Sequence, residues 1–239
     1  MALLPASQAG FAGKSCRIMP LGGASEFKLP IFPTNTNAAQ TASVTYGKGS
    51  TDGNGYRGTL YNLLLADGND VDMVGSQKGG NMSDPDNEGY NGLIITEIDA
   101  KGNTAMPIYQ PNIVAIVAGT NDMKRDIDVA DAPNRLKNLI QDVLDASSET
   151  VVVVSTLHPN ADPPSEERIL AFNAALPDLV QSFVDAGKPV ILVDSHAVIA
   201  VGDLVDGTHP NDAGYARMGK AFYDGIQEAY KRGWIFDIQ

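Results

Sequence analysis

The stretch NIVAIVAGTND, residues 112–122, decides the fold. Its first part is apolar without alternation, which is typical of a strand buried on both faces of a parallel sheet. Its last part changes abruptly to Gly, Thr, Asn and Asp, the residue types that end a strand and begin a turn. A polar loop directly after a buried strand is where α/β proteins place their ligands. The stretch therefore predicts both a central strand and part of a functional site.

Segments of two kinds alternate on either side of this stretch. Short apolar runs predict four further strands, at residues 17–21, 71–76, 150–157 and 189–195. Amphipathic segments predict helices at residues 56–66, 129–146, 166–186 and 211–232. This order predicts a three-layer α/β/α sandwich with a mainly parallel, flavodoxin-like five-stranded sheet and right-handed crossovers.

Composition narrows the domain organisation and the possible partners. A chain of 239 residues with 43% hydrophobic residues fits one domain at residues 17–239, preceded by an extension at 1–16. A net charge of −12 disfavours nucleic acid and anionic membrane surfaces as partners. The single cysteine, Cys16, predicts a small buried side chain rather than a disulfide. We see no signal peptide in residues 1–16, and the sequence leaves the oligomeric state open.

Loop motifs for phosphate, nucleotide and calcium do not fit this chain. GFAGKS, residues 10–15, would end a phosphate loop whose first glycine falls at position 8, where Gln8 stands. GKGSTDG has one residue too many for a dinucleotide loop. DPDNEG, residues 84–89, begins like a calcium loop, but Ile95 stands where a bidentate Glu is needed. We therefore expect no cofactor and no metal. A G-x-S-x-G elbow is also missing from the sequence.

Three loops carry groups suited to acyl-transfer chemistry. DGTHPNDAGY, residues 206–215, places Asp206 three residues before His209, so that the carboxylate reaches Nδ1 and leaves Nε2 free to act as a base. Asn121, directly after the central strand, has an amide suited to a developing oxyanion. Gly92, in EGYNGL, offers an unobstructed backbone N–H. The alternative for each is structural: a His-Pro surface turn, an Asx turn and a glycine-rich loop.

Together these blocks resemble the SGNH hydrolases, also called GDSL-type esterases, over about residues 17–230. STDGNGYR, VDMVGSQKGG and DPDNEGYNG make the chain similar to the acetylxylan-esterase branch, the third carbohydrate-esterase family. The resemblance implies a catalytic Ser, with Asp206 and His209, and an oxyanion hole formed by that Ser, Gly92 and Asn121. We interpret His158 as a turn residue, although a place in the substrate site stays open, and His196 as structural.

The nucleophile block is interrupted. The branch follows its first strand with a pattern such as I-M-P-L-G-[AD]-S-I-T-Y-G, and removal of residues 23–41 joins the flanks as RIMPLG-ASVTYGKG. This restores the pattern with Ser43 as the nucleophile. Ser25, in GGAS, is the weaker alternative because EFKLP follows it. The insert is explained either as a retained intron or as a lid, and we expect it to reduce or abolish activity because it lies two residues before Ser43.

The resemblance implies a serine esterase that removes O-acetyl or other short acyl groups from carbohydrate such as acetylated xylan. It also suggests an extracellular location, which the missing signal peptide leaves uncertain. The alternative function is a catalytically impaired SGNH-fold protein that binds carbohydrate or acts as a scaffold, because of the insert.

Overall fold

The computed structural model describes residues 12–24 and 44–236. Ser25, Ser43 and most of the segment predicted as an insert lie outside the described residues. Among the described residues no helix is long and apolar enough to cross a bilayer.

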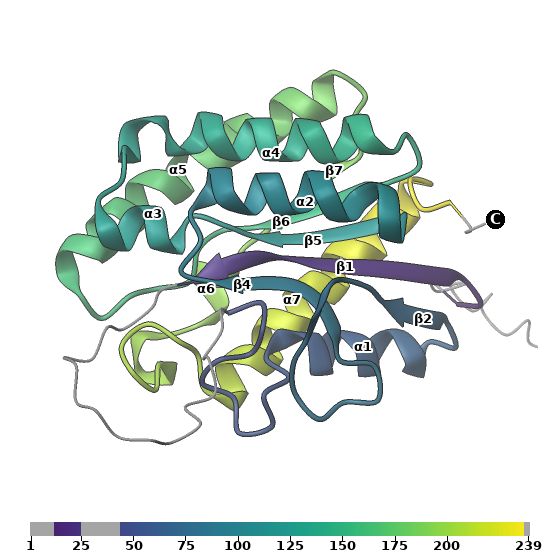
Figure 1. Cartoon of the computed structure of the whole chain (residues 1–239), viewed down its shortest axis with the longest axis horizontal. Coiled ribbons are helices and arrows are strands. Elements are labelled where there is room, and N and C mark those ends of the chain that lie inside the picture. Colours follow the sequence, from purple (N-terminus) through teal and green to yellow (C-terminus); the bar gives the residue numbers. More distant parts are fainter. Residues whose placement is uncertain (1–11, 25–43, 237–239) are drawn as a thin grey trace, which may run out of the picture.

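One sheet of seven strands forms the middle of the molecule (Figure 1). The strands are β1 (Ser15–Ala24), β2 (Asp70–Met73), β3 (Gln77–Lys78), β4 (Asp86–Asn91), β5 (Ile113–Val117), β6 (Val151–Ser155) and β7 (Val190–Val193). The five predicted strands form the parallel series β2-β1-β5-β6-β7. β4 adds a further parallel strand, and β3 pairs with β4 in the antiparallel sense.

β1 is the longest of the described strands and pairs with three others. β5 follows it in register from Ile18 opposite Ile113 to Gly22 opposite Val117. On the other edge, β2 pairs with the first residues of β1 and β4 pairs with the last, up to Ala24 opposite Asn91. The strand therefore continues two residues into the segment predicted as an insert.

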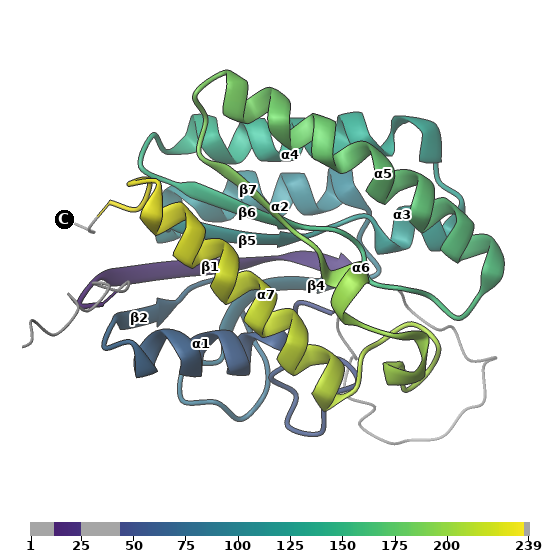
Figure 2. The same ribbon diagram turned by 180° about the vertical axis from the view of Figure 1, so that it is seen from behind.

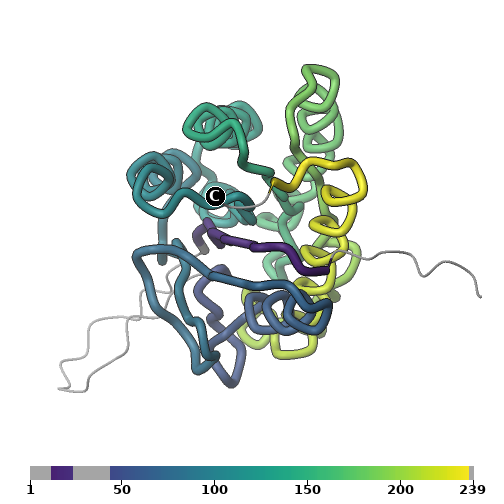
Figure 3. Tube along the Cα trace, turned by 90° about the vertical axis from the view of Figure 1, so that its right-hand side faces the viewer, coloured from purple at the N-terminus to yellow at the C-terminus, as the bar shows by residue number. Residues whose placement is uncertain are grey.

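Helices cover both faces of the sheet. They are α1 (Tyr56–Ala66), α2 (Ile95–Tyr109), α3 (Thr120–Arg125), α4 (Ala132–Ala146), α5 (Pro163–Asp185), α6 (Ser195–Val198) and α7 (Asp212–Lys231), with 3-10 turns η1 (Val129–Asp131) and η2 (Val201–Asp203). Figure 1 shows α2 to α5 above the strands and α1 below them. Figure 2, which views the molecule from the opposite side, shows α7 crossing in front of the strands. The view in Figure 3 places β1 between the two helical layers.

The core lies on both faces of the central strands. All five residues of β5 and the first three of β6 are fully buried, which explains their unbroken apolar sequence. On the other side of the sheet Tyr56 of α1 stacks on Phe222 of α7, with ring centroids 4.8 Å apart. Two glycines permit close packing here, since a Cβ at Gly219 would lie 2.6 Å from the Tyr56 carbonyl oxygen and one at Gly225 2.6 Å from Val193.

The predicted α/β/α architecture is confirmed, and two kinds of element were missed. β3 and β4 carry Asp, Asn, Glu and Lys rather than an apolar run, so DPDNEG and EGYNGL have the sequence pattern of loops. α2 contains Gly102 and Pro107, which are poor helix formers. The predicted last helix is confirmed: α7 begins at Asp212, and the Asn211 side chain caps it by accepting from Gly214 N at 2.9 Å.

Candidate active site

Asp206 and His209 form a close pair in the loop between η2 and α7. The loop is closed by a bridge between Leu204 and Pro210 and by a hydrogen bond from Val205 N to the His209 carbonyl at 2.9 Å. Nδ1 of His209 lies 2.8 Å from Oδ2 and 3.0 Å from Oδ1 of Asp206. The backbone N–H of His209 donates to the same carboxylate at 2.8 Å. The spacing of three residues thus produces the predicted contact.

The free nitrogen of His209 faces away from this carboxylate. Its Nε2 is buried and has no hydrogen-bond partner among residues 12–24 and 44–236. Since Asp206 holds Nδ1 and only accepts, Nδ1 carries the proton and Nε2 of the neutral ring is an acceptor. This is the tautomer of a general base.

Burial, hydrogen bonds and nearby charges shift the pKa values of Asp206 and His209. Burial lowers the pKa of His209, Asp206 opposes this, and Lys48 and Lys124 lower it further. For Asp206, burial alone would raise the pKa, but hydrogen bonds from the ring and backbone of His209 hold it well below its usual range. Lys48 Nζ lies 3.8 Å from Asp206 Oδ2. The carboxylate is therefore ionised and the imidazole neutral near neutral pH.

The loop at residues 44–55 lies between β1 and this pair. Thr45 is fully buried against Gly22 of β1: a Cβ at Gly22 would lie 2.4 Å from Thr45 Oγ1. Further along, Gly49 has a φ of +97°, and a Cβ there would lie 2.6 Å from the Pro210 carbonyl oxygen and 3.1 Å from Cβ of His209. The residues that follow Ser43 therefore connect the carboxyl end of β1 to the His209 loop.

Arg57 in α1 holds that loop, and sequence analysis did not identify it. Its guanidinium is fully buried and donates to the carbonyls of Thr45 at 2.8 Å, Tyr46 at 2.8 Å, Gly79 at 2.8 Å and Pro85 at 3.0 Å. The planar fork of five N–H groups suits such convergence of carbonyls. A lone Arg at the start of an amphipathic segment gave no signal of this role.

Gly92 and Asn121 lie together at the next strand ends. Asn121, in the first turn of α3, is fully buried and its Nδ2 donates to the Leu93 carbonyl at 2.7 Å, directly beside Gly92. Gly92 has a φ of +74°, and Arg125 donates to its carbonyl at 2.9 Å. The structure thus brings together two of the residues predicted for an oxyanion hole, and one N–H of the Asn121 amide is already used by Leu93.

Asp122, also missed as a functional residue, ties this corner to α2. Its carboxylate is fully buried and accepts from Ile95 N at 3.1 Å and from Arg135 at 2.9 Å. Burial raises its pKa, and the bond from Arg135 opposes the shift. The signal was available in GTND, where an acidic residue directly follows Asn121 at the end of a buried strand.

The other two histidines have structural partners. His158 is not the turn residue that the sequence predicts: its side chain is almost fully buried, with Nε2 2.6 Å from the Thr208 carbonyl. Nε2 of His196 lies 2.8 Å from the Glu166 carboxylate, in keeping with a structural role.

The acidic residues of DPDNEG, the segment that begins like a calcium loop, have protein partners. Asp84 accepts from Met73 N at 2.6 Å, and Asp86 pairs with Lys78 at 2.6 Å.

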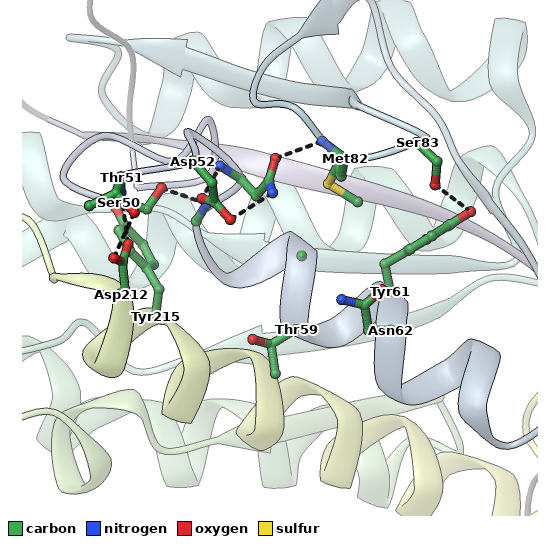
Figure 4. Close-up of a pocket in the computed structure, with 13 residues that line it drawn as sticks. Ser50, Thr51, Asp52, Thr59, Tyr61, Asn62, Met82, Ser83, Asp212 and Tyr215 are labelled. Atoms are coloured by element: carbon green, nitrogen blue, oxygen red, sulfur yellow. Dashed lines mark hydrogen bonds between the residues drawn. The ribbon is translucent and has the colours of Figure 1, made fainter.

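A polar cavity of about 460 Å³ lies beside the loop at residues 44–55 (Figure 4). Thr51 donates to Asp212 through both its backbone N and Oγ1, each at 2.8 Å, and Ser83 donates to Tyr61 at 3.3 Å. Neither Asp206 nor His209 lines this cavity. No group of three His, Cys, Asp or Glu side chains suited to a metal occurs in the described part of the chain.

The fold and the family match together define a class: the chain has the SGNH hydrolase fold. The chain belongs to the GDSL-like lipase/acylhydrolase family, whose model matches residues 42–217. The match begins one residue before Ser43 and directly after the predicted insert.

Individual relatives agree with the family. The chain is 28% identical over 236 residues to a multidomain esterase of Ruminococcus flavefaciens, a match that covers 83% of this chain and 30% of that protein. It therefore spans about 30% of the length of that relative. A family 3 carbohydrate esterase of Clostridium thermocellum is 27% identical with a TM-score of 0.75, covering 92% of this chain and 99% of the other. A family 3 esterase of Talaromyces cellulolyticus shares the fold at 22% identity and a TM-score of 0.72, covering 91% and 99%.

Proposed function

We propose that this chain is a serine esterase that removes O-acetyl or other short acyl groups from carbohydrate such as acetylated xylan. The observation that carries the proposal is the Asp206–His209 pair, with Nδ1 held at 2.8 Å and Nε2 buried without a partner among the described residues. Similarity to the Clostridium thermocellum carbohydrate esterase supports the substrate class.

In the proposed reaction, Ser43 Oγ attacks the acyl carbonyl carbon while His209 Nε2 takes the hydroxyl proton. His209 then gives that proton to the departing sugar oxygen as the ester C–O bond breaks, which leaves the acyl group on Ser43. Water attacks the acyl-enzyme, His209 again takes the proton, and Ser43 regains it as the carboxylic acid leaves. Asp206 holds the ring in the required tautomer throughout.

The proposed oxyanion hole consists of the N–H groups of Ser43 and Gly92 and the Asn121 amide. The contact between Asn121 and Leu93 supports this assignment, because it fixes the amide next to Gly92. Loss of one such donor lowers turnover by about 10²–10³. The role of Ser43 rests on the family match and on the packing of Thr45 against Gly22.

A serine-reactive fluorophosphonate probe and 4-nitrophenyl acetate test the proposal. In the chain that lacks residues 23–41, we expect Ser43→Ala and His209→Asn to abolish labelling and hydrolysis. In the full chain, we expect Ser25→Ala to leave both as they are in the parent chain. Acetate release from acetylated xylan, compared with release of longer acids from 4-nitrophenyl butyrate and octanoate, tests the acyl group. A folded chain that neither labels nor hydrolyses esters, with or without residues 23–41, would instead support the binding or scaffold alternative.

A further inference from the structure

The peptide unit between Thr208 and His209 is held from both sides. Its N–H donates to Asp206 Oδ1 at 2.8 Å, and its carbonyl lies 2.6 Å from His158 Nε2. The same Asp206 carboxylate accepts from the His209 ring at 2.8 Å. One peptide unit therefore connects His158 to the carboxylate that orients His209.

The contact fixes the tautomer of His158. A carbonyl oxygen only accepts, so Nε2 of His158 carries a hydrogen and donates it to Thr208. Nδ1 is then a bare acceptor in the neutral ring, and it is buried with no partner in the described part of the chain. Burial lowers the pKa of His158 to about 4, against the opposing effect of the Thr208 carbonyl, so the ring is neutral near pH 7. A buried acceptor without a partner costs stability, and such a group calls for a physical explanation.

The contact between His158 and Thr208 is one of several hydrogen bonds between the loop that follows β6 and the loop of the Asp–His pair. Ala161 N donates to the Gly207 carbonyl at 2.8 Å, and Asn160 Nδ2 donates to Thr208 Oγ1 at 3.2 Å. The loop that follows β6 thus supports the loop of the Asp–His pair along its length. Of these contacts, the one from His158 reaches the peptide of His209 itself.

We propose that His158 is a positioning residue: by holding the Thr208–His209 peptide, it fixes the geometry of the Asp206–His209 pair. The inference rests on the roles proposed above for Asp206 and His209. This role explains why an imidazole occupies position 158 although its Nδ1 has no partner among the described residues. Hydrogen-bonded supports of this kind hold catalytic groups within about 0.5 Å of a productive geometry.

The titration of His209 reports on this geometry. Asp206 stabilises the protonated imidazolium, so a carboxylate that is held less well stabilises it less and the pKa of His209 falls. The chain contains three histidines, so ring-¹⁵N NMR of the full chain resolves each one. The other titratable or charged groups near His209 are Lys48 and Lys124, and those near His158 are His196 and Glu166. The His158 variants below leave all four in place, and the control variant replaces His196 alone.

Three substitutions separate positioning from simple packing. His158→Gln places an amide N–H near the position of Nε2 and keeps the donor, whereas His158→Phe keeps the ring and removes it. His158→Asn is polar, but its amide is too short to reach the Thr208 carbonyl. We expect the pKa of His209 to be unchanged in His158→Gln and to fall by about one unit, a tenfold change in its protonation constant, in His158→Phe and His158→Asn. The Nδ1–H signal of His209 should exchange faster in the last two.

The control is His196→Gln, which removes a neighbouring imidazole without touching Thr208 and should leave the titration of His209 as it is. If His158→Phe does not fold, His158→Asn decides the question. A folded variant without the donor, in which the pKa and Nδ1–H exchange of His209 match those of the parent chain, overturns the inference. Since these readouts need no ester hydrolysis, an inactive chain can still uphold the inference, and an active chain can still fail it.

Discussion

Gly22, two residues before the end of β1, lies directly against Thr45, the second residue after Ser43. A Cβ at Gly22 would lie 2.4 Å from Thr45 Oγ1 and 2.2 Å from the Val117 carbonyl oxygen. The chain thus comes back to the strand that it left at Ala24. This contact supports the proposal that Ser43 follows the first strand in space, although a long segment separates them in sequence.

The same contact predicts that Gly22→Ala destabilises the protein. The added methyl group would meet a backbone oxygen of β5, which cannot turn away as a flexible side chain can. We expect the free energy of unfolding in urea to fall by about 1–3 kcal/mol. Gly202→Ala is the matched control, because a Cβ there has no atom within 4 Å. Equal stability of the two variants would contradict the close packing of Gly22 and Thr45.

Arg57 provides a second test of the loop that follows Ser43. Arg57→Met removes the hydrogen bonds that the buried guanidinium donates to the carbonyls of Thr45, Tyr46, Gly79 and Pro85. We expect a loss of about 3 kcal/mol in the free energy of unfolding. Arg232→Met, which breaks an exposed pair with Glu228, should change it by about 0.5 kcal/mol or less. A small effect at Arg57 would show that the loop holds its shape without the guanidinium.

The pH dependence of ester hydrolysis should follow His209. The base is active when neutral, so kcat/KM rises with pH through the pKa of His209 and then levels off. Because burial and the two lysines lower this pKa, the rise should occur below the ordinary histidine value of 6.5. Asp206→Asn removes the group that favours the protonated ring, so the rise should move to lower pH while turnover falls. A midpoint that stays in place in Asp206→Asn would argue against their coupling.

His158 should make the fold sensitive to acid. Its pKa is about 4 in the folded protein and 6.5 ordinarily, so below pH 6.5 the unfolded chain binds a proton that the folded chain does not. Stability from this group is fully present above pH 6.5 and is lost as the pH falls toward 4, by up to about 3 kcal/mol. Urea unfolding at several pH values should give a flatter dependence for His158→Gln. Parallel curves for the variant and the parent would show that His158 titrates normally.

The sequence patterns that succeeded were those with a simple physical signature. Unbroken apolar runs located β5 and β6, because both faces of these strands are buried. A spacing of three residues located the Asp206–His209 pair, and amphipathic periodicity located α7 directly after it. Such features depend on neighbouring residues alone.

The patterns that failed depend on contacts between distant residues. β4 is polar, and its pairing with the end of β1 cannot be derived from its own residues. Arg57 and His158 act through carbonyls of segments far away in sequence, with the Thr208 carbonyl as the partner of His158. Helix periodicity and strand patterns contain no information about such partners.

The central claim is that Ser43 and His209 together hydrolyse an acyl ester. The most direct test is 4-nitrophenyl acetate hydrolysis by the full chain beside a chain that lacks residues 23–41, each with its Ser43→Ala counterpart. We predict hydrolysis by the shortened chain, reduced or no hydrolysis by the full chain, and loss of all activity in both Ser43→Ala variants. Well-folded chains that are inactive in both forms, or activity that survives Ser43→Ala, would contradict the account.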